Sequence, residues 1–192
     1  MADAVLAETD EAFAELAALA TALPASLPAL QSVTALLQSA LAAGGTVYSF
    51  GNGGSAADAM HLTGELVGHY RLDRRPLRAV TIGADPVVAT CIANDYDTTQ
   101  VFARPVSALA GPGDVVVAFS TSGRSPNVVA GLRAGRDAGA TTVLLGGADG
   151  GPAAAWADHT LLVPSRSTPR IQEIHTVFLH LISDALDRWA AA

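Results

Sequence analysis

The apolar residues of the chain follow two spacings in turn. Short apolar or β-branched runs predict five strands, at residues 46–50, 77–82, 114–119, 141–145 and 160–163. Apolar residues with helical spacing predict helices over residues 56–67, 85–93, 98–109, 128–138, 152–157 and 168–189. Strands that alternate with helices predict an α/β fold, a three-layer sandwich in which helices flank a five-stranded parallel sheet and the last helix is long.

Two further helices precede the first strand. Residues 3–22 and about 26–43 have helical apolar spacing, and Pro24 and Pro28 punctuate the sequence between them. We expect an antiparallel pair whose alanine-rich surfaces pack on the domain or on another copy of the chain. The whole chain, residues 1–192, is predicted to form one domain, with residues 1–44 used in packing and oligomerisation.

The central feature is a glycine-rich turn between the first strand and the next helix, residues 51–55. Its glycines allow backbone N–H groups to approach a ligand, and the helix start adds unpaired donors and a positive dipole end. This turn predicts a phosphate site. The spacing Gly51-x-Gly53-x-x-Ala56 also fits a dinucleotide fingerprint, but the acidic residue it requires has only Asp85 as an approximate candidate. An ordinary tight turn is the third interpretation.

A second polar loop follows a continuous apolar strand. Residues 120–125 read Ser-Thr-Ser-Gly-Arg-Ser, and hydroxyls and backbone N–H groups there can bind phosphate oxygens without a cation. Helix capping is the simpler explanation, but capping needs only one hydroxyl. Because both loops follow parallel strands, we expect them to border one crevice.

Acid–base and metal chemistry has candidates on two helices. His61 and Glu65 are four residues apart and project from one helical face, although such a pair is often only a solvated surface pair. The last helix carries Gln172, Glu173, His175 and His180. Gln172 and His180 are eight residues apart, about 12 Å along a helix, which suggests that they serve sites in different subunits.

Composition excludes several functional classes. The formal net charge is −7, from 11 basic and 18 acidic residues, so we expect no nucleic-acid partner. Every basic residue is arginine, which excludes a Schiff-base lysine and a Walker lysine. Cys91 is the single cysteine, so an internal disulfide is impossible. The acidic N-terminus lacks the basic region of a signal peptide, and we expect a cytoplasmic protein with no membrane partner.

Four motifs carry a resemblance to a known family. The stretches FGNGGSAADAMHLTGELVGHY, IANDYDTTQVFARPV, GDVVVAFSTSGRSPNVV and RIQEIHTVFLHLISDALD resemble the phosphoheptose (sedoheptulose 7-phosphate) isomerases of the sugar isomerase (SIS) domain superfamily. The likeness covers nearly the whole chain and keeps the order of the motifs. It implies the SIS fold and an aldose–ketose isomerase that interconverts D-sedoheptulose 7-phosphate and D-glycero-D-manno-heptose 7-phosphate through an enediol.

The resemblance also implies a set of site residues. Glu65 would be the base and His180 the acid or proton shuttle, in a homotetramer whose sites lie between subunits. Zn²⁺ would bind His61, Glu65, Gln172 and His180. The substrate would be bound by Asn52, Gly53, Gly54, Ser55, Asn94, Asp95, Ser120, Thr121, Ser122, Ser125 and Gln172. His69 and Pro169 depart from the family pattern beside the site, which leaves the sugar portion less defined than the reaction type.

Three rival functions stay open at this point. A related family with the same fold associates with the bacterial replication initiator without catalysis, but its members lack the catalytic Glu and the second His, both of which this chain retains. The chain could also isomerise another sugar phosphate. A sugar-phosphate-sensing regulatory domain is a weaker rival, because such domains are usually fused to a DNA-binding region.

Overall fold

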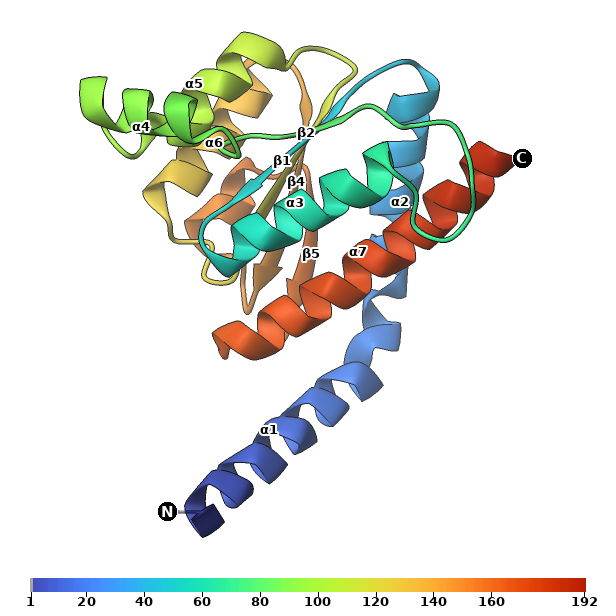
Figure 1. The fold of residues 1–192 in the computed structure, drawn as a ribbon, viewed down its shortest axis with the longest axis vertical. Helices are drawn as coiled ribbons and strands as arrows, with labels where there is room; N and C mark the ends of the chain where they lie inside the picture. The colour runs from blue at the N-terminus through green and yellow to red at the C-terminus, as the bar shows by residue number, and fades with distance from the viewer. Residues whose placement is uncertain (1) are drawn as a thin grey trace.

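The computed structural model describes the backbone of residues 2–192 and the side chains from residue 9 onward, and it contains one parallel five-stranded sheet (Figure 1). The strands are β1 (Val47–Gly51), β2 (Ala79–Thr81), β3 (Val115–Ser120), β4 (Thr141–Gly147) and β5 (His159–Val163). The helices are α1 (Ala2–Ala22), α2 (Leu27–Ala42), α3 (Gly54–Val67), α4 (Pro86–Asp95), α5 (Gln100–Leu109), α6 (Pro126–Asp137) and α7 (Thr168–Ala191), with 3-10 turns η1 (Leu23–Ser26) and η2 (Gly151–Trp156).

The sheet is covered on both faces because the strand side chains alternate between two apolar cores. Along β3, Val115, Val117 and Phe119 belong to the core shared with α2, α3 and α7. Val116 and Ala118 belong to the core shared with α5 and α6. β3 is therefore buried along its whole length, and the predicted three-layer α/β fold is confirmed.

The strand order, β2-β1-β3-β4-β5, places a switch point beside β1. The chain leaves β1 toward β2 and then returns to add β3 on the other side of β1. In open α/β sheets of this order, ligands bind in the crevice outside the carboxyl ends of the two strands at the switch point. These ends lead into the glycine turn after β1 and the serine loop after β3.

The antiparallel N-terminal pair predicted above is wrong. A four-residue 3-10 turn joins α1 to α2 without reversing the chain, so α1 projects away from the sheet (Figure 1). Among the side chains of α1 described by the structure, Phe13 is 67% exposed, and Arg170 of α7 donates a hydrogen bond to the Ala12 carbonyl oxygen at 2.7 Å. Helical spacing predicts both helices but says nothing of the angle between them.

The same N-terminal region bears on the membrane question. Thr9–Ala42 is a helical stretch whose length and composition alone would allow it to cross a membrane. Only 6% of its most apolar window is buried in the structure. Such a stretch is weak evidence by itself, and the expected absence of a membrane partner stays a prediction.

Candidate active site

The turn after β1 holds Ser55 at the start of α3. Gly53 has φ of +57°, a conformation that favours glycine, and it precedes the first residue of the helix. The Ser55 N–H donates to the Asn52 carbonyl oxygen at 3.0 Å, and the Ser55 side chain is buried. The amides of Asn52 and Asn127 exchange two hydrogen bonds of 2.9 and 2.8 Å, which tie this turn to α6.

The loop after β3 is fixed by its own hydroxyls. Ser120 Oγ accepts a hydrogen bond from the Gly123 N–H at 3.1 Å, and Ser122 Oγ accepts one from the Arg124 N–H at 3.2 Å. A Cβ atom on Gly123 would lie 1.8 Å from the Gly150 carbonyl oxygen, so no other residue fits there without a backbone shift. Side chain–backbone contacts of this kind hold the loop in one conformation.

A pocket of about 220 Å³ lies between the two loops, at the switch point of the sheet. Hydroxyls and amides line it, and the N-termini of α3 and α6 border it, an arrangement that suits an anion. The pocket is lined by Asn52, Gly54, Ser55, Phe119, Ser120, Thr121, Ser122, Ser125, Thr168 and Gln172. Most residues predicted to bind substrate are therefore brought together, with Gly53 in the same turn. Phe119 and Thr168 are additional lining residues that the motifs did not single out.

α3 and α7 lie side by side and run parallel from this pocket (Figure 1). At their starts, the Gln172 amide packs on Gly54, where an added Cβ would lie 2.5 Å from Gln172 Nε2. Further along the helices, the rings of His61 and His180 meet edge to face with centroids 5.0 Å apart. One pair of helices thus carries both the serine-lined pocket and the predicted acid–base residues.

His61, Glu65 and His180 form one half-buried group within a single chain. His61 Nε2 lies 2.9 Å from Glu65 Oε1, and one donor atom from each of the three residues lies within 4.8 Å of the others. The spacing argument assigned Gln172 and His180 to different subunits. Because α3 and α7 pack in parallel, both residues contact α3 of the same chain, Gln172 at Gly54 and His180 at His61. Gln172 lies at the serine-lined pocket, whereas His180 lies beside Glu65.

Comparisons with known proteins agree with this geometry. The family model of the SIS domain matches residues 13–147. A phosphoheptose isomerase of Geobacter sp. (strain M21) is 47% identical over 169 residues, which are 88% of each protein. This chain belongs to the phosphoheptose isomerase family. The structure of a phosphoheptose isomerase from Francisella tularensis matches with a TM-score of 0.88 and 31% identity, covering 97% of each chain. The enzyme from Neisseria gonorrhoeae matches with a TM-score of 0.86 and 34% identity, covering 97% of this chain and 98% of the other.

Family membership confirms the resemblance, the fold and the enzyme class, a sugar-phosphate isomerase. The non-catalytic alternative is not favoured, because the relatives compared above are named isomerases. The individual site residues, the metal and the oligomeric state stay predictions, which the geometry of this family member can support or weaken.

Between the two ends of the helix pair lies a buried polar contact that the motifs did not reveal. Asp58 Oδ2 is 4.0 Å from His175 Nδ1, and neither atom has a hydrogen-bond partner among the residues that the structure describes. Burial raises the pKa of Asp58 to about 6 and lowers the pKa of His175 to about 4, so near pH 7 the histidine is neutral. The sequence held a signal for Asp58, because it lies one turn before His61 on the same helical face.

The segment after α3 is tied to α7 by a buried ion pair. Arg74 Nε lies 2.9 Å from Asp187 Oδ1, and both side chains are 1% exposed. The same segment carries Tyr70, whose ring stacks on His180 with centroids 5.2 Å apart. Its neighbour His69, one of the two departures from the family pattern, is exposed. Nothing in the sequence links positions 74 and 187.

Three predicted or departing residues lie away from the two groups described above. Asn94 and Asp95 end α4, which packs on α5 at the outside of the molecule (Figure 1), and neither lines the serine-lined pocket. The Asn94 amide instead donates to the Asp95 carboxylate at 2.8 Å. Pro169 is exposed near the start of α7, where a proline is well tolerated.

Proposed function

We propose that the chain converts D-sedoheptulose 7-phosphate into D-glycero-D-manno-heptose 7-phosphate. The observation that carries this proposal is the parallel helix pair α3–α7, which has hydroxyls at one end and His61, Glu65 and His180 further along. A sugar whose phosphate lies in the serine-lined pocket extends along these helices toward the acid–base group. Membership of the phosphoheptose isomerase family supports the choice of sugar.

The reaction moves two protons. The Glu65 carboxylate removes a proton from C1 of the ketose, which gives an enediol across C1 and C2, and the proton returns to C2. The O1 proton passes to O2, and we assign this transfer to His180, a role supported by its position beside His61 and Glu65. Ser55, Ser120 and Ser122 bind and orient the phosphate, which keeps the carbon chain extended toward Glu65.

A zinc ion fits the same group. Two imidazole nitrogens and one carboxylate oxygen are donors that zinc accepts, and small side-chain adjustments bring atoms within 4.8 Å onto one ion. His61, Glu65 and His180 would hold it, whereas Gln172, the fourth ligand predicted from the sequence, lies at the serine-lined pocket. Bound zinc supplies polarisation of the carbonyl and hydroxyl oxygens. A Glu65 engaged on zinc is a weaker base, so the two roles of Glu65 compete. Metal analysis of protein grown with added zinc tests this proposal, and much less than one zinc per chain contradicts it.

Replacement of the base tests the proposed reaction directly. Glu65→Gln keeps the shape of the side chain and should lower the rate of isomerisation about 10²- to 10⁴-fold, while binding of sugar phosphate persists. Proton NMR of the turnover mixture measures the rate. Asp137→Asn, at the exposed end of α6 and outside both pockets, is the control and should keep full activity. A Glu65→Gln rate within tenfold of wild type, about 1.4 kcal/mol, removes Glu65 from the role of base.

The proposed assembly is a cytoplasmic homotetramer in which a second chain completes each site. Asn94 and Asp95 motivate this proposal, because they lie outside the pocket of their own chain, and Phe13 of α1 is 67% exposed, although Leu16 and Leu19 pack on the core. Glu65→Gln and Asp95→Asn variants, each inactive alone, should regain activity in mixed oligomers. A mixture of Glu65→Gln and His180→Gln should stay inactive, because in this proposal the same chain supplies both Glu65 and His180 to each site. An active Asp95→Asn variant, or the opposite pattern of complementation, contradicts this arrangement.

A further inference from the structure

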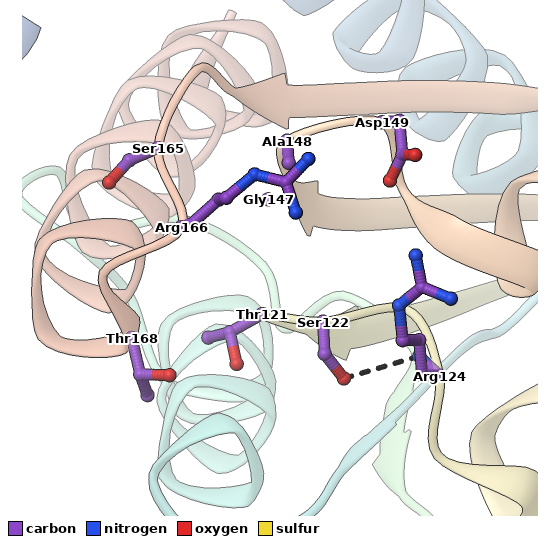
Figure 2. Close-up of a pocket in the computed structure, with 9 residues that line it drawn as sticks. All are labelled: Thr121, Ser122, Arg124, Gly147, Ala148, Asp149, Ser165, Arg166 and Thr168. Carbon is purple, nitrogen blue, oxygen red and sulfur yellow. Dashed lines mark hydrogen bonds between the residues drawn. The ribbon is translucent and has the colours of Figure 1, made fainter.

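A second pocket adjoins the serine-lined pocket at the carboxyl ends of β3, β4 and β5 (Figure 2). The two pockets share Thr121, Ser122 and Thr168, so the serine loop is a wall common to both. Arg124 enters the second pocket from the loop after β3, and Arg166 enters it from the segment between β5 and α7. The reaction proposed above uses neither arginine.

Both guanidinium groups are free to bind an anion. In Figure 2 the two guanidinium groups converge with the carboxylate of Asp149. Among the side chains that the structure describes, residues 9–192, neither guanidinium donates a hydrogen bond or forms an ion pair. By contrast, Arg74, Arg170 and Arg188 of the same chain each pair with a carboxylate.

Asp149 leaves the pocket with a net positive charge. Its Oδ1 accepts a hydrogen bond from the Gly151 N–H at 3.1 Å. That bond, with the charges of Arg124 and Arg166, holds the pKa of Asp149 below its usual range. Two guanidiniums therefore face one carboxylate, in a chain whose formal charge is −7. Arginine forks match the oxygens of a phosphoryl group.

The position of the second pocket decides which anion fits. Thr168, the first residue of α7, is shared by the two pockets, whereas the sugar of the proposed substrate runs the other way, along α7 toward His180. A group attached to the far side of the bound phosphate would therefore point toward the arginines. We propose that Arg124 and Arg166 form a second anion subsite, which takes the outer phosphoryl group of a diphosphate whose inner phosphoryl group lies in the serine-lined pocket.

This proposal rests on the proposed phosphate site, and it makes diphosphates competitors of the substrate. Two sources share the required chemistry, free pyrophosphate and a diphosphate ester. In the ester, the organic group takes the path of the substrate's sugar. Calorimetric titrations of the metal-free, full-length protein at low ionic strength can separate these cases, with inorganic phosphate, pyrophosphate and ADP as the probes.

We expect wild type to bind pyrophosphate at least tenfold more tightly than inorganic phosphate. In the Arg124→Gln/Arg166→Gln variant this preference should fall to about twofold or less. The Arg133→Gln/Arg136→Gln variant removes the same charge from α6 outside both pockets, and it should keep the wild-type preference. ADP binding more tightly than pyrophosphate identifies an ester as the ligand, and weaker ADP binding identifies the free anion.

The failures of the two proposals are distinguishable. If wild type binds phosphate and pyrophosphate equally, or if the control variant loses as much preference as the Arg124/Arg166 variant, the second subsite is refuted and the first stands. If Ser55→Ala leaves the affinity for inorganic phosphate unchanged, the phosphate site itself is refuted, and the second subsite falls with it.

Discussion

The buried ion pair between Arg74 and Asp187 gives a sharp stability prediction. Asp187 Oδ2 accepts hydrogen bonds from the N–H groups of Tyr70, Arg71 and Leu72, at 3.1, 2.7 and 2.9 Å. The Arg74 guanidinium donates to the carbonyl oxygens of Leu66 and Gly68, both at 2.8 Å, and to that of Glu65. The pair therefore provides hydrogen-bond donors for the backbone carbonyl oxygens at the end of α3, and it holds the segment that carries Tyr70 against α7.

Asp187→Asn keeps the shape of the side chain and removes its charge. It leaves the Arg74 guanidinium buried without a counter-charge, and breaking a buried pair in this way costs about 3–5 kcal/mol. We expect the free energy of unfolding to fall by about 3 kcal/mol, a loss that a domain with a typical stability of about 5–15 kcal/mol survives. Urea denaturation followed by circular dichroism, at several protein concentrations, measures this change.

The control is Asp184→Asn on the same helix. Asp184 pairs with Arg188 at 2.7 Å, but the Arg188 side chain is 71% exposed, so this loss should stay below about 1 kcal/mol. Burial alone raises the pKa of Asp187, but hydrogen bonds from Arg71, Leu72 and Arg74 outweigh it and hold the pKa below its usual range. A lowered pKa adds stability above the unfolded value of about 3.9, so the difference between wild type and Asp187→Asn should shrink below about pH 4. Equal losses for the two variants at pH 7 would refute the reasoning.

Two further predictions concern the pocket and the buried polar contact. Ser55→Ala should weaken the binding of phosphorylated sugars by about 1.5–3 kcal/mol and leave the binding of free sugars unaffected. The control is Ser183→Ala, which removes a buried hydroxyl without a partner among the described residues and should change neither affinity. Equal losses for both sugar types would show that Ser55 does not hold the phosphate. Burial lowers the pKa of His175 to about 4, so this residue lowers the free energy of unfolding of the protein as the pH falls from about 6.5 to 4. Burial raises the pKa of Asp58 to about 6, so this residue raises the free energy of unfolding as the pH falls from about 6 to 4. Asp58→Asn should therefore steepen the acid loss of the metal-free protein by on the order of 3 kcal/mol, and urea midpoints at pH 4–7 that run parallel to wild type would contradict this.

The sequence predicts the sheet and the positions of the glycine and serine loops because both depend on local signals. β3 is apolar at consecutive positions, and the turns at Gly53 and Gly123 need backbone conformations that favour glycine. Length and spacing therefore suffice to place the strands, and the loops follow at their carboxyl ends. β2 is shorter than predicted, three residues at the edge of the sheet, where it pairs with β1 alone.

Features that depend on packing between distant segments could not be predicted from the sequence. α1 is alanine-rich, so its periodicity could not show that Leu16 and Leu19 would pack on the core while Phe13 stays exposed. The spacing of Gln172 and His180 along α7 led to the prediction that they serve different subunits, because it could not show how α7 packs on α3. A separation of about 12 Å excludes one compact site, but it does not exclude an extended one when a second helix runs alongside. Arg124 and Arg166 converge only because three strands end at one edge of the sheet.

The helix pair places the two predicted groups of site residues in a fixed relation within one chain. α3 and α7 both begin at the carboxyl edge of the sheet, so their first turns meet at the serine-lined pocket and their later turns meet at Glu65 and His180. Packing fixes this separation, since the apolar residues of both helices lie in one core and the Arg74–Asp187 pair closes the end of α3. The buried Asp58–His175 contact lies midway, where the two helices touch. By contrast, α4 packs mainly on α5, and Asn94 and Asp95 at its end hydrogen-bond to each other. The predicted acid–base and phosphate residues therefore lie on one helix pair, and the α4 residues are the part of the predicted site that our proposal assigns to a second chain.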